Sequence, residues 1–217
     1  MSGDDVAPGA GDPGGAGRPR TRWEAQVEAN PQHSHWYVDR FRRMAAQGAD
    51  LAGEARLVDA MMARGSRVLD AGCGPGRVGA ELAARGHAVV GVDVDPVLVA
   101  AAEEDHPGPT WLAEDLAALD LPARGIDEPF DVVVCAGNVL TFLAPGTEVE
   151  VLRRMGAHLA PGGRVVVGFG AGRGYAFDAF FADVGAAGMR VDVALSTWDL
   201  RPFGEGSDFL VAVLARA

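Results

Sequence analysis

Lysine is absent from this sequence, so all 19 basic side chains among its 217 residues are arginines. Enzymes that use pyridoxal phosphate, and the lysine aldolases, form a Schiff base with an internal lysine amine. The usual phosphate-binding P-loop also requires a lysine. The absence of this one residue type therefore excludes these kinds of active site.

Positive charge and cysteine are scarce as well. The 30 acidic side chains outnumber the 19 basic ones, which gives a net charge of −11. Since nucleic-acid binding gains most of its affinity by neutralising phosphates, we expect no nucleic-acid partner. The two cysteines, Cys73 and Cys135, are too few for a disulfide framework and are typical of a reducing cytosol.

Long apolar runs are also missing. No stretch approaches the roughly 18 consecutive apolar residues that a membrane span needs. The N-terminus lacks the basic and then apolar order of a signal peptide. The sequence therefore predicts a cytoplasmic protein with no membrane partner.

The chain divides into three parts. Residues 1–20 hold six glycines and three prolines, with too few large apolar side chains to offset the entropy of ordering, which predicts a disordered tail. Residues 21–65 show apolar side chains at helical spacing, with Gly48 between two helical segments, and are interpreted as a lid. From residue 66 to 217, short β-rich runs alternate with helical ones.

This alternation predicts an α/β fold with a parallel, doubly wound sheet covered by helices on both faces. The strands are expected at residues 67–70, 88–92, 110–113, 130–135, 164–169, 189–196 and 208–214. The last two have no helix between them and should pair antiparallel. Asp95 is predicted to cap a helix that begins at Pro96, and Thr147 with Glu150 to form a capping box. Residues 161–163, Pro-Gly-Gly, are expected to break the chain before the fifth strand.

A glycine-rich loop is the strongest chemical signal. Residues 68–77 read Val-Leu-Asp-Ala-Gly-Cys-Gly-Pro-Gly-Arg, so a strand leads through three alternate glycines into a helix. Glycine lets the backbone approach a ligand closely, and a helix N-terminus offers free N–H groups. Residues 74–79 also satisfy the dinucleotide pattern G-x-G-x-x-G, so the loop alone does not choose between ligands.

Polar residues follow the next three strands. Asp93 ends the second strand, where a carboxylate can accept both ribose hydroxyls of an adenosine. Asp115 follows the third strand and can accept from an adenine amine, while Leu116 packs on the ring. The fourth strand ends in Ala136, Gly137 and Asn138, at the sheet edge where open α/β folds bind ligands.

Together these motifs resemble those of the class I S-adenosylmethionine-dependent methyltransferases, over about residues 66–216. The resemblance implies a Rossmann-like, seven-stranded sheet with an antiparallel last strand, and S-adenosyl-L-methionine as the cofactor. Gly72, Cys73 and Gly74 would line the methionine moiety, and Asp70 would order the loop or reach the methionine amine through water. The cofactor-binding residues expected in this way are Asp70, Gly72, Cys73, Gly74, Gly76, Asp93, Val94, Asp115, Leu116, Ala136, Gly137 and Asn138.

The chain departs from one branch of that family. Members that methylate nucleic-acid bases carry [DN]-P-P-[YFW] after the fourth strand, where this sequence reads Ala-Gly-Asn-Val. The strand end is more similar to that of small-molecule methyltransferases. Residues 36–40 and 197–202 resemble an uncharacterised bacterial group of such enzymes, so we expect a small-molecule acceptor.

Methyl transfer from a sulfonium is an in-line displacement, which needs positioning more than a triad or a metal. No metal is expected, and His33 with His35 is interpreted as a pair of surface or lid residues. Tyr37, His35 and Asn138 are the candidates for a catalytic role. The substrate pocket is expected to involve Trp36, Tyr37, Arg40, Thr141, Arg173, Tyr175 and Trp198.

Alternatives remain open for the protein and for its N-terminal helices. The glycine pattern also fits an NAD(P)-dependent oxidoreductase, and the same fold serves non-catalytic S-adenosylmethionine-binding proteins. The N-terminal aromatic residues fit packing on the sheet, or on a second subunit, as well as they fit a lid.

Overall fold

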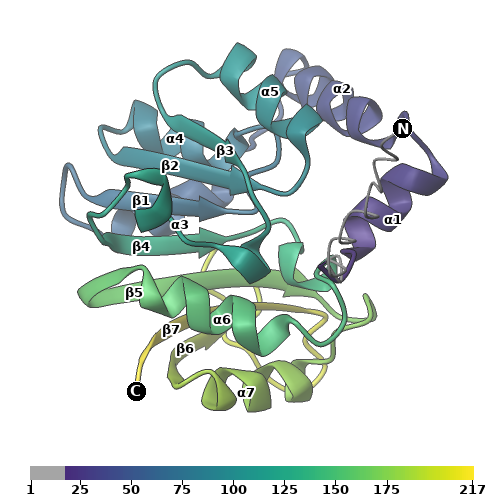
Figure 1. The fold of residues 1–217 in the computed structure, drawn as a ribbon. Coiled ribbons are helices and arrows are strands. Elements are labelled where there is room, and N and C mark those ends of the chain that lie inside the picture. The colour runs from purple at the N-terminus through teal and green to yellow at the C-terminus, as the bar shows by residue number, and fades with distance from the viewer. Residues whose placement is uncertain (1–17) are drawn as a thin grey trace, which may run out of the picture.

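Seven strands in the described part of the chain form one sheet in the order β3-β2-β1-β4-β5-β7-β6, as Figure 1 shows. The structure is a computed structural model that describes residues 18–217, so most of the tail expected at residues 1–20 lies outside the described residues. The strands are β1 (Arg67–Ala71), β2 (Ala88–Asp93), β3 (Thr110–Ala113), β4 (Phe130–Cys135), β5 (Leu159–Gly170), β6 (Met189–Leu195) and β7 (Phe209–Arg216). The α-helices are α1 (Arg22–Ala29), α2 (His33–Ala46), α3 (Gly53–Ala60), α4 (Arg77–Ala84), α5 (Pro96–Asp105), α6 (Glu148–Ala157) and α7 (Phe177–Ala186).

Strand direction follows the connections. The pairs among β3, β2, β1, β4 and β5 are parallel, because a helix or a longer crossover lies between consecutive strands. β7 pairs antiparallel with both β5 and β6, which confirms the expected pairing of the last two strands. The doubly wound sheet with an antiparallel last strand is thus confirmed.

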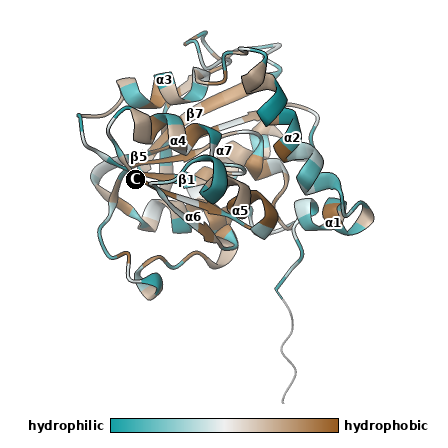
Figure 2. Ribbon diagram, turned by 90° about the horizontal axis from the view of Figure 1, so that it is seen from above, coloured by the Kyte–Doolittle hydropathy of each residue, from teal (hydrophilic) through white to brown (hydrophobic). Residues whose placement is uncertain are grey.

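Both faces of the sheet are apolar, because each strand alternates its side chains between two helical layers. Leu69 and Val133 pack on the face covered by α6 and α7, whereas Val68 and Val132 pack on the face covered by α3 and α4. Figure 2 shows hydrophobic colour concentrated on the strands and the inner parts of the helices. No helix within residues 18–217 is long and apolar enough to cross a membrane.

The N-terminal part contains one more break than expected. The sequence predicts two helical segments around Gly48, but three helices precede β1. The extra break follows Asn30, the C-cap of α1, and Pro31 explains it because proline has no N–H to continue a helix. α1 itself begins with a capping box formed by Thr21 and Glu24.

Two local predictions are wrong. Thr147 has helical backbone angles and its hydroxyl donates to the Ala144 carbonyl, at 2.7 Å, so the expected capping box with Glu150 does not form. Residues 161–163 do not break the chain before the fifth strand; they lie within β5. The register shifts there, from Phe130 opposite Leu159 to Val132 opposite Arg164, so residues 160–163 interrupt the regular pairing with β4.

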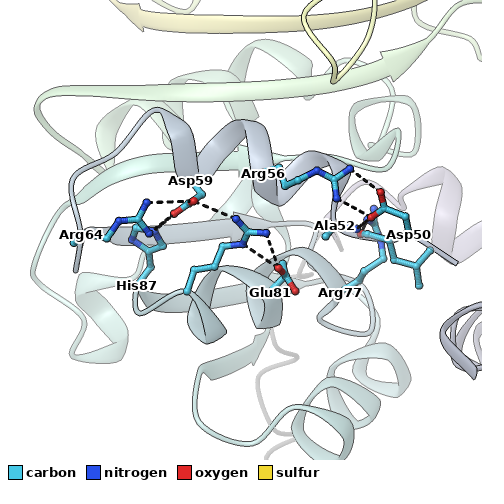
Figure 3. A network of polar contacts seen from close by, with 10 residues as sticks. Asp50, Ala52, Arg56, Asp59, Arg64, Arg77, Glu81 and His87 are labelled. Atoms are coloured by element: carbon cyan, nitrogen blue, oxygen red, sulfur yellow. Dashed lines mark hydrogen bonds and ion pairs between the residues drawn. The ribbon is translucent and has the colours of Figure 1, made fainter. Parts of the chain in front are cut away.

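A polar network fixes α3 against α4 and the start of β2, as Figure 3 shows. Asp59 accepts from Arg64 at 2.8 Å, from His87 Nε2 at 2.9 Å and from Arg85 at 3.2 Å. Hydrogen bonds from His87 first, and then from the arginines, hold the pKa of Asp59 well below its usual range. α3 is therefore part of the layer that covers the sheet.

Candidate functional site

The glycine loop after β1 has the backbone geometry that only glycine adopts easily. Gly72, Gly74 and Gly76 have φ angles of 82°, 53° and 84°, in the left-handed region. The N–H groups of Gly72 and Cys73 donate to the Val92 carbonyl at 2.7 and 3.0 Å. The loop is therefore fixed to the end of β2 and its path is set by the glycines.

Asp70 orders the start of the next helix. Its carboxylate accepts from the Gly79 N–H at 2.8 Å and the residue is only 2% exposed. Burial raises the pKa of Asp70 to about 7, and the bond from Gly79 opposes that shift. Asp70 is thus bonded to the first turn of α4, and both roles expected for it, in ordering the loop and toward the methionine amine, stay predictions.

Asp93 connects the glycine loop to the segment that follows β2. One carboxylate oxygen accepts from the Gly74 N–H and the other from the Asp95 N–H, both at 2.9 Å. Burial raises the pKa of Asp93 to about 6, although these two bonds favour the ionised form. Because a carboxylate offers about four acceptor positions, Asp93 retains acceptor capacity toward a ligand.

Asp115 lies where β3 has ended and a short 3₁₀ turn begins. One oxygen accepts from the Ala117 N–H at 2.9 Å, and the other pairs with Arg18 at 3.1 Å. Leu116, directly after it, is buried. An acid and an apolar side chain therefore stand side by side at this point of the sheet edge.

These elements surround one pocket at the carboxyl ends of the strands. It encloses about 840 Å³ of free space, its open mouth included. The expected cofactor residues that line it are Asp70, Gly72, Cys73, Gly74, Asp93, Val94, Asp115, Leu116, Ala136 and Gly137. Four separate strand ends thus converge on the same space.

The N-terminal helices supply the opposite wall. Trp23 from α1 and Tyr37 and Phe41 from α2 line the pocket, and the rings of Phe142 and Trp23 meet in a T-shape with their centroids 5.6 Å apart. The Tyr37 ring lies beside Gly74, where an added Cβ would be 3.8 Å from Cε1. Burial raises the pKa of Tyr37, so this phenol stays protonated at neutral pH.

Two of the expected cofactor residues lie outside the pocket lining. Gly76 is covered by Ala102 and Trp111, against which an added Cβ would collide at 3.0 and 3.1 Å. Asn138 directs its side-chain oxygen to the Gly170 N–H at 2.8 Å, so its amide joins the ends of β4 and β5. Both residues shape the backbone around the pocket rather than its surface.

Most of the expected substrate residues are also elsewhere. Thr141 is buried and its hydroxyl donates to the Asn138 carbonyl. Tyr175 is buried against Phe169, and its hydroxyl donates to Asp183 at 2.8 Å. Trp198 packs on Gly168, on the face of the sheet that α3 and α4 cover. Trp36, Arg40 and Arg173 are solvent-exposed and do not line the pocket, and the same holds for His35, a candidate for a catalytic role.

Several pocket residues were not expected from the sequence. They are Thr21, Trp23, Phe41, Pro75, Arg77, Val78, Leu98, Val139, Phe142 and Leu143. Arg77 was within reach of sequence reasoning, because it directly follows the glycine loop. Trp23 and Phe142 carry no local signal, since they meet only through tertiary packing. Within residues 18–217, no group of three or more His, Cys, Asp or Glu side chains is arranged to hold a metal ion.

Comparison with known proteins finds methyltransferases. The model of a methyltransferase domain family matches residues 68–163. An uncharacterised methyltransferase of Mycobacterium tuberculosis is 39% identical over 51% of this chain and 54% of its own length. The ubiquinone biosynthesis O-methyltransferase of Pseudomonas syringae is 31% identical over 66% of this chain and 55% of its own. The chain spans about a third to a half of the curated relatives that it matches.

A solved structure gives fuller coverage. The TehB-like SAM-dependent methyltransferase of Corynebacterium glutamicum is 45% identical, with a TM-score of 0.81, over 87% of this chain and all of that one. Such identity across an entire domain accompanies common descent rather than a shared fold alone. This chain belongs to the class I S-adenosylmethionine-dependent methyltransferases.

Proposed function

We propose that this protein transfers the methyl group of S-adenosylmethionine to a small-molecule acceptor by in-line displacement. One observation carries the proposal: the glycine loop, Asp93, Asp115 and the small residues after β4 all line one pocket. An adenosine with an amino-acid chain needs such a set of partners, in that arrangement along the sheet edge. Membership of the family supports the same cofactor and leaves no support for the oxidoreductase alternative.

The pocket walls fit the cofactor. A Cβ added to Gly137 would meet nothing within 4 Å, and one added to Gly74 would meet only the Tyr37 ring, at 3.8 Å, so the backbone at both positions faces the pocket. Asp93 has acceptor positions left for the ribose hydroxyls. Asp115 and Leu116 offer the adenine an acceptor for its amine and an apolar surface for its ring.

When bound, the cofactor supplies a methyl group already activated on a sulfonium. The chain then has to hold an acceptor atom about 3 Å from that methyl, in line with the bond that breaks. The aromatic side chains of Trp23, Tyr37 and Phe41 line the pocket and would shield the bound methyl group from water. Because the Tyr37 phenol stays protonated, we assign it hydrogen-bond donation rather than proton removal.

We propose a small metabolite as the acceptor. The net charge of −11 disfavours a nucleic acid, and the Pseudomonas relative is by name an O-methyltransferase of ubiquinone biosynthesis. A cytoplasmic location is part of the same proposal. It is supported by the two cysteines, both buried free thiols.

Calorimetric titration with S-adenosylhomocysteine, and in parallel with NADH, tests the cofactor. We expect the first to bind and the second not to bind; the reverse result would overturn the proposal. Incubation with methyl-labelled S-adenosylmethionine and a broad metabolite panel then tests transfer. Tight S-adenosylhomocysteine binding without label transfer to any member would favour a non-catalytic binding protein instead.

A further inference from the structure

Asp95 has more bonds than a helix cap needs. One oxygen accepts from the Val97 N–H at 2.9 Å, which is the expected cap of α5. The other oxygen accepts from the indole Nε1 of Trp23 at 2.8 Å and also from the Ser34 hydroxyl. A single carboxylate therefore holds α5, α1 and α2 together.

These contacts are shielded from water. Asp95 is 5% exposed and Ser34 is fully buried. The other polar contacts between the N-terminal helices and the sheet layer include exposed pairs, such as Arg42 with Asp105. A buried hydrogen bond to a charged group contributes more than an exposed ion pair. Asp95 is thus a buried attachment point of α1 and α2.

The same residue reaches the cofactor acid through its backbone. The Asp95 N–H donates to Asp93, whose other oxygen accepts from Gly74 in the glycine loop. On the other side, Trp23 packs against Tyr37 and Phe142, which line the pocket. A continuous path of contacts therefore connects the N-terminal wall of the pocket with the group expected at the ribose.

We propose that Asp95 is a positioning residue that couples the α1–α2 wall to Asp93, so that release of Trp23 and Ser34 from Asp95 opens the pocket and frees the cofactor. This inference rests on the proposed function, because it concerns retention of the same cofactor. Trp23 and Asp93 are linked only through Asp95 in this path. Loss of the Ser34 donor should therefore weaken cofactor binding at a distance, whereas loss of the Trp23 donor also alters a residue that lines the pocket.

Ser34→Ala is the most informative variant, because Ser34 does not line the pocket and can act on the cofactor only through the wall it anchors. Trp23→Phe removes the indole donor but keeps an aromatic ring. Tyr175→Phe is the matched control. It also deletes a hydrogen bond between an aromatic side chain and a carboxylate, at residues that do not line the pocket.

Binding of S-adenosylhomocysteine to the full chain is measured by calorimetry, and its dissociation by surface plasmon resonance. We expect Trp23→Phe and Ser34→Ala to weaken binding by about 5- to 20-fold, mainly through faster dissociation. Bound ligand should protect the arginines of α1 and α2 from trypsin in the wild type, and less so in these variants. Tyr175→Phe should match the wild type in both measurements.

A double variant, Trp23→Phe with Asp95→Asn, completes the test. If the path is correct, its loss of affinity is smaller than the sum of the two single losses. Folded Ser34→Ala and Trp23→Phe proteins with wild-type affinity and dissociation rate would overturn the role of Asp95 while leaving the proposed function intact. A wild-type protein that binds no S-adenosylhomocysteine would overturn both.

Discussion

Gly91 on β2 pairs in register with Trp111 on β3, and the indole ring lies across the glycine. A Cβ at position 91 would be 2.2 Å from ring atom Cε3, a distance that no side chain tolerates. The ring also packs against Gly76 and Gly79, so it supports the end of the glycine loop and the first turn of α4. The sequence shows Gly91 only as part of the Gly-Val-Asp strand end, whereas the structure gives it a steric reason.

Gly91→Ala should therefore destabilise the protein by about 1–3 kcal/mol, the usual cost of overpacking a core. Urea unfolding followed by circular dichroism measures the change. Gly185→Ala is the matched control, because that helical glycine has no neighbour within 4 Å of an added Cβ. The control should be neutral or gain up to about 1 kcal/mol. Equal effects of the two substitutions would contradict the steric role of Trp111.

Asp93→Asn should lower the affinity for S-adenosylhomocysteine by about 1.5–3 kcal/mol, since hydrogen bonds to a charged acceptor are lost. The new amide NH₂ group would also face one of the two N–H groups that now donate to Asp93, so one of these hydrogen bonds is lost. Asp131→Asn is a suitable control: Asp131 also accepts a backbone N–H, from Arg67 at 2.8 Å, but lies at the start of β4. Unchanged affinity in a folded Asp93→Asn protein would refute the ribose assignment.

Cofactor affinity should depend on pH through Asp93. Burial raises its pKa to about 6, and hydroxyl donors of a ribose bind the ionised form. The affinity should therefore be constant above about pH 7 and fall by about tenfold per pH unit as pH decreases below 6, because one proton must leave before binding.

Titrations at several pH values between 5 and 8 measure this dependence. Asp70 is the other pocket carboxyl with a pKa in this range, raised to about 7, and it serves as the comparison. Asp70→Asn should keep the decrease below pH 6, whereas Asp93→Asn should abolish it. If Asp70→Asn abolished the decrease and Asp93→Asn kept it, the titrating group would be Asp70 and the assignment to Asp93 would be wrong.

The fold could be predicted closely because its signals are local. Strands β3 and β4 begin and end at the predicted residues, and the Asp95–Pro96 helix start was read from residues adjacent in sequence. The capping box at Thr147 failed although its motif is present, because the threonine hydroxyl bonds to Ala144 instead. A motif states which bonds are possible, and the backbone angles decide which of them form.

The cofactor side of the site could also be predicted from the sequence, since each expected element follows a strand directly. The pocket wall formed by α1 and α2 could not be predicted in this way. Trp23 and Phe142 are 119 residues apart in the sequence and meet only because α1 folds back over the strand ends. Tyr175 and Trp198 are expected in the pocket from the sequence, yet Tyr175 is buried in the core and Trp198 packs, partly buried, against the other face of the sheet. Long-range packing of this kind leaves no periodic pattern to read.

An ion pair between Arg77 and Glu54 supports the pocket wall. Arg77 lines the pocket, and its guanidinium donates to both carboxylate oxygens of Glu54, one of them at 2.7 Å. Both side chains are only 18% exposed. Glu54→Gln would leave a partly buried cation with a neutral partner, so we expect a loss of about 1.5–3 kcal/mol of stability at pH 7. Glu28→Gln, in the exposed pair with Arg20, should cost at most about 1 kcal/mol.

The same pair sets an acid dependence whose sign is fixed. Burial alone would raise the pKa of Glu54, but the bonds and charge of Arg77 outweigh it and lower the pKa below the ordinary 4.5. A carboxyl with a lowered pKa stabilises the folded state above its unfolded pKa, and that contribution disappears as pH falls through the folded value. Urea unfolding at pH 7 and at successively lower pH values below 4.5 should therefore show the wild type losing its advantage over Glu54→Gln. If the difference between the two proteins stayed constant on acidification, Arg77 would not be stabilised by an ionised Glu54.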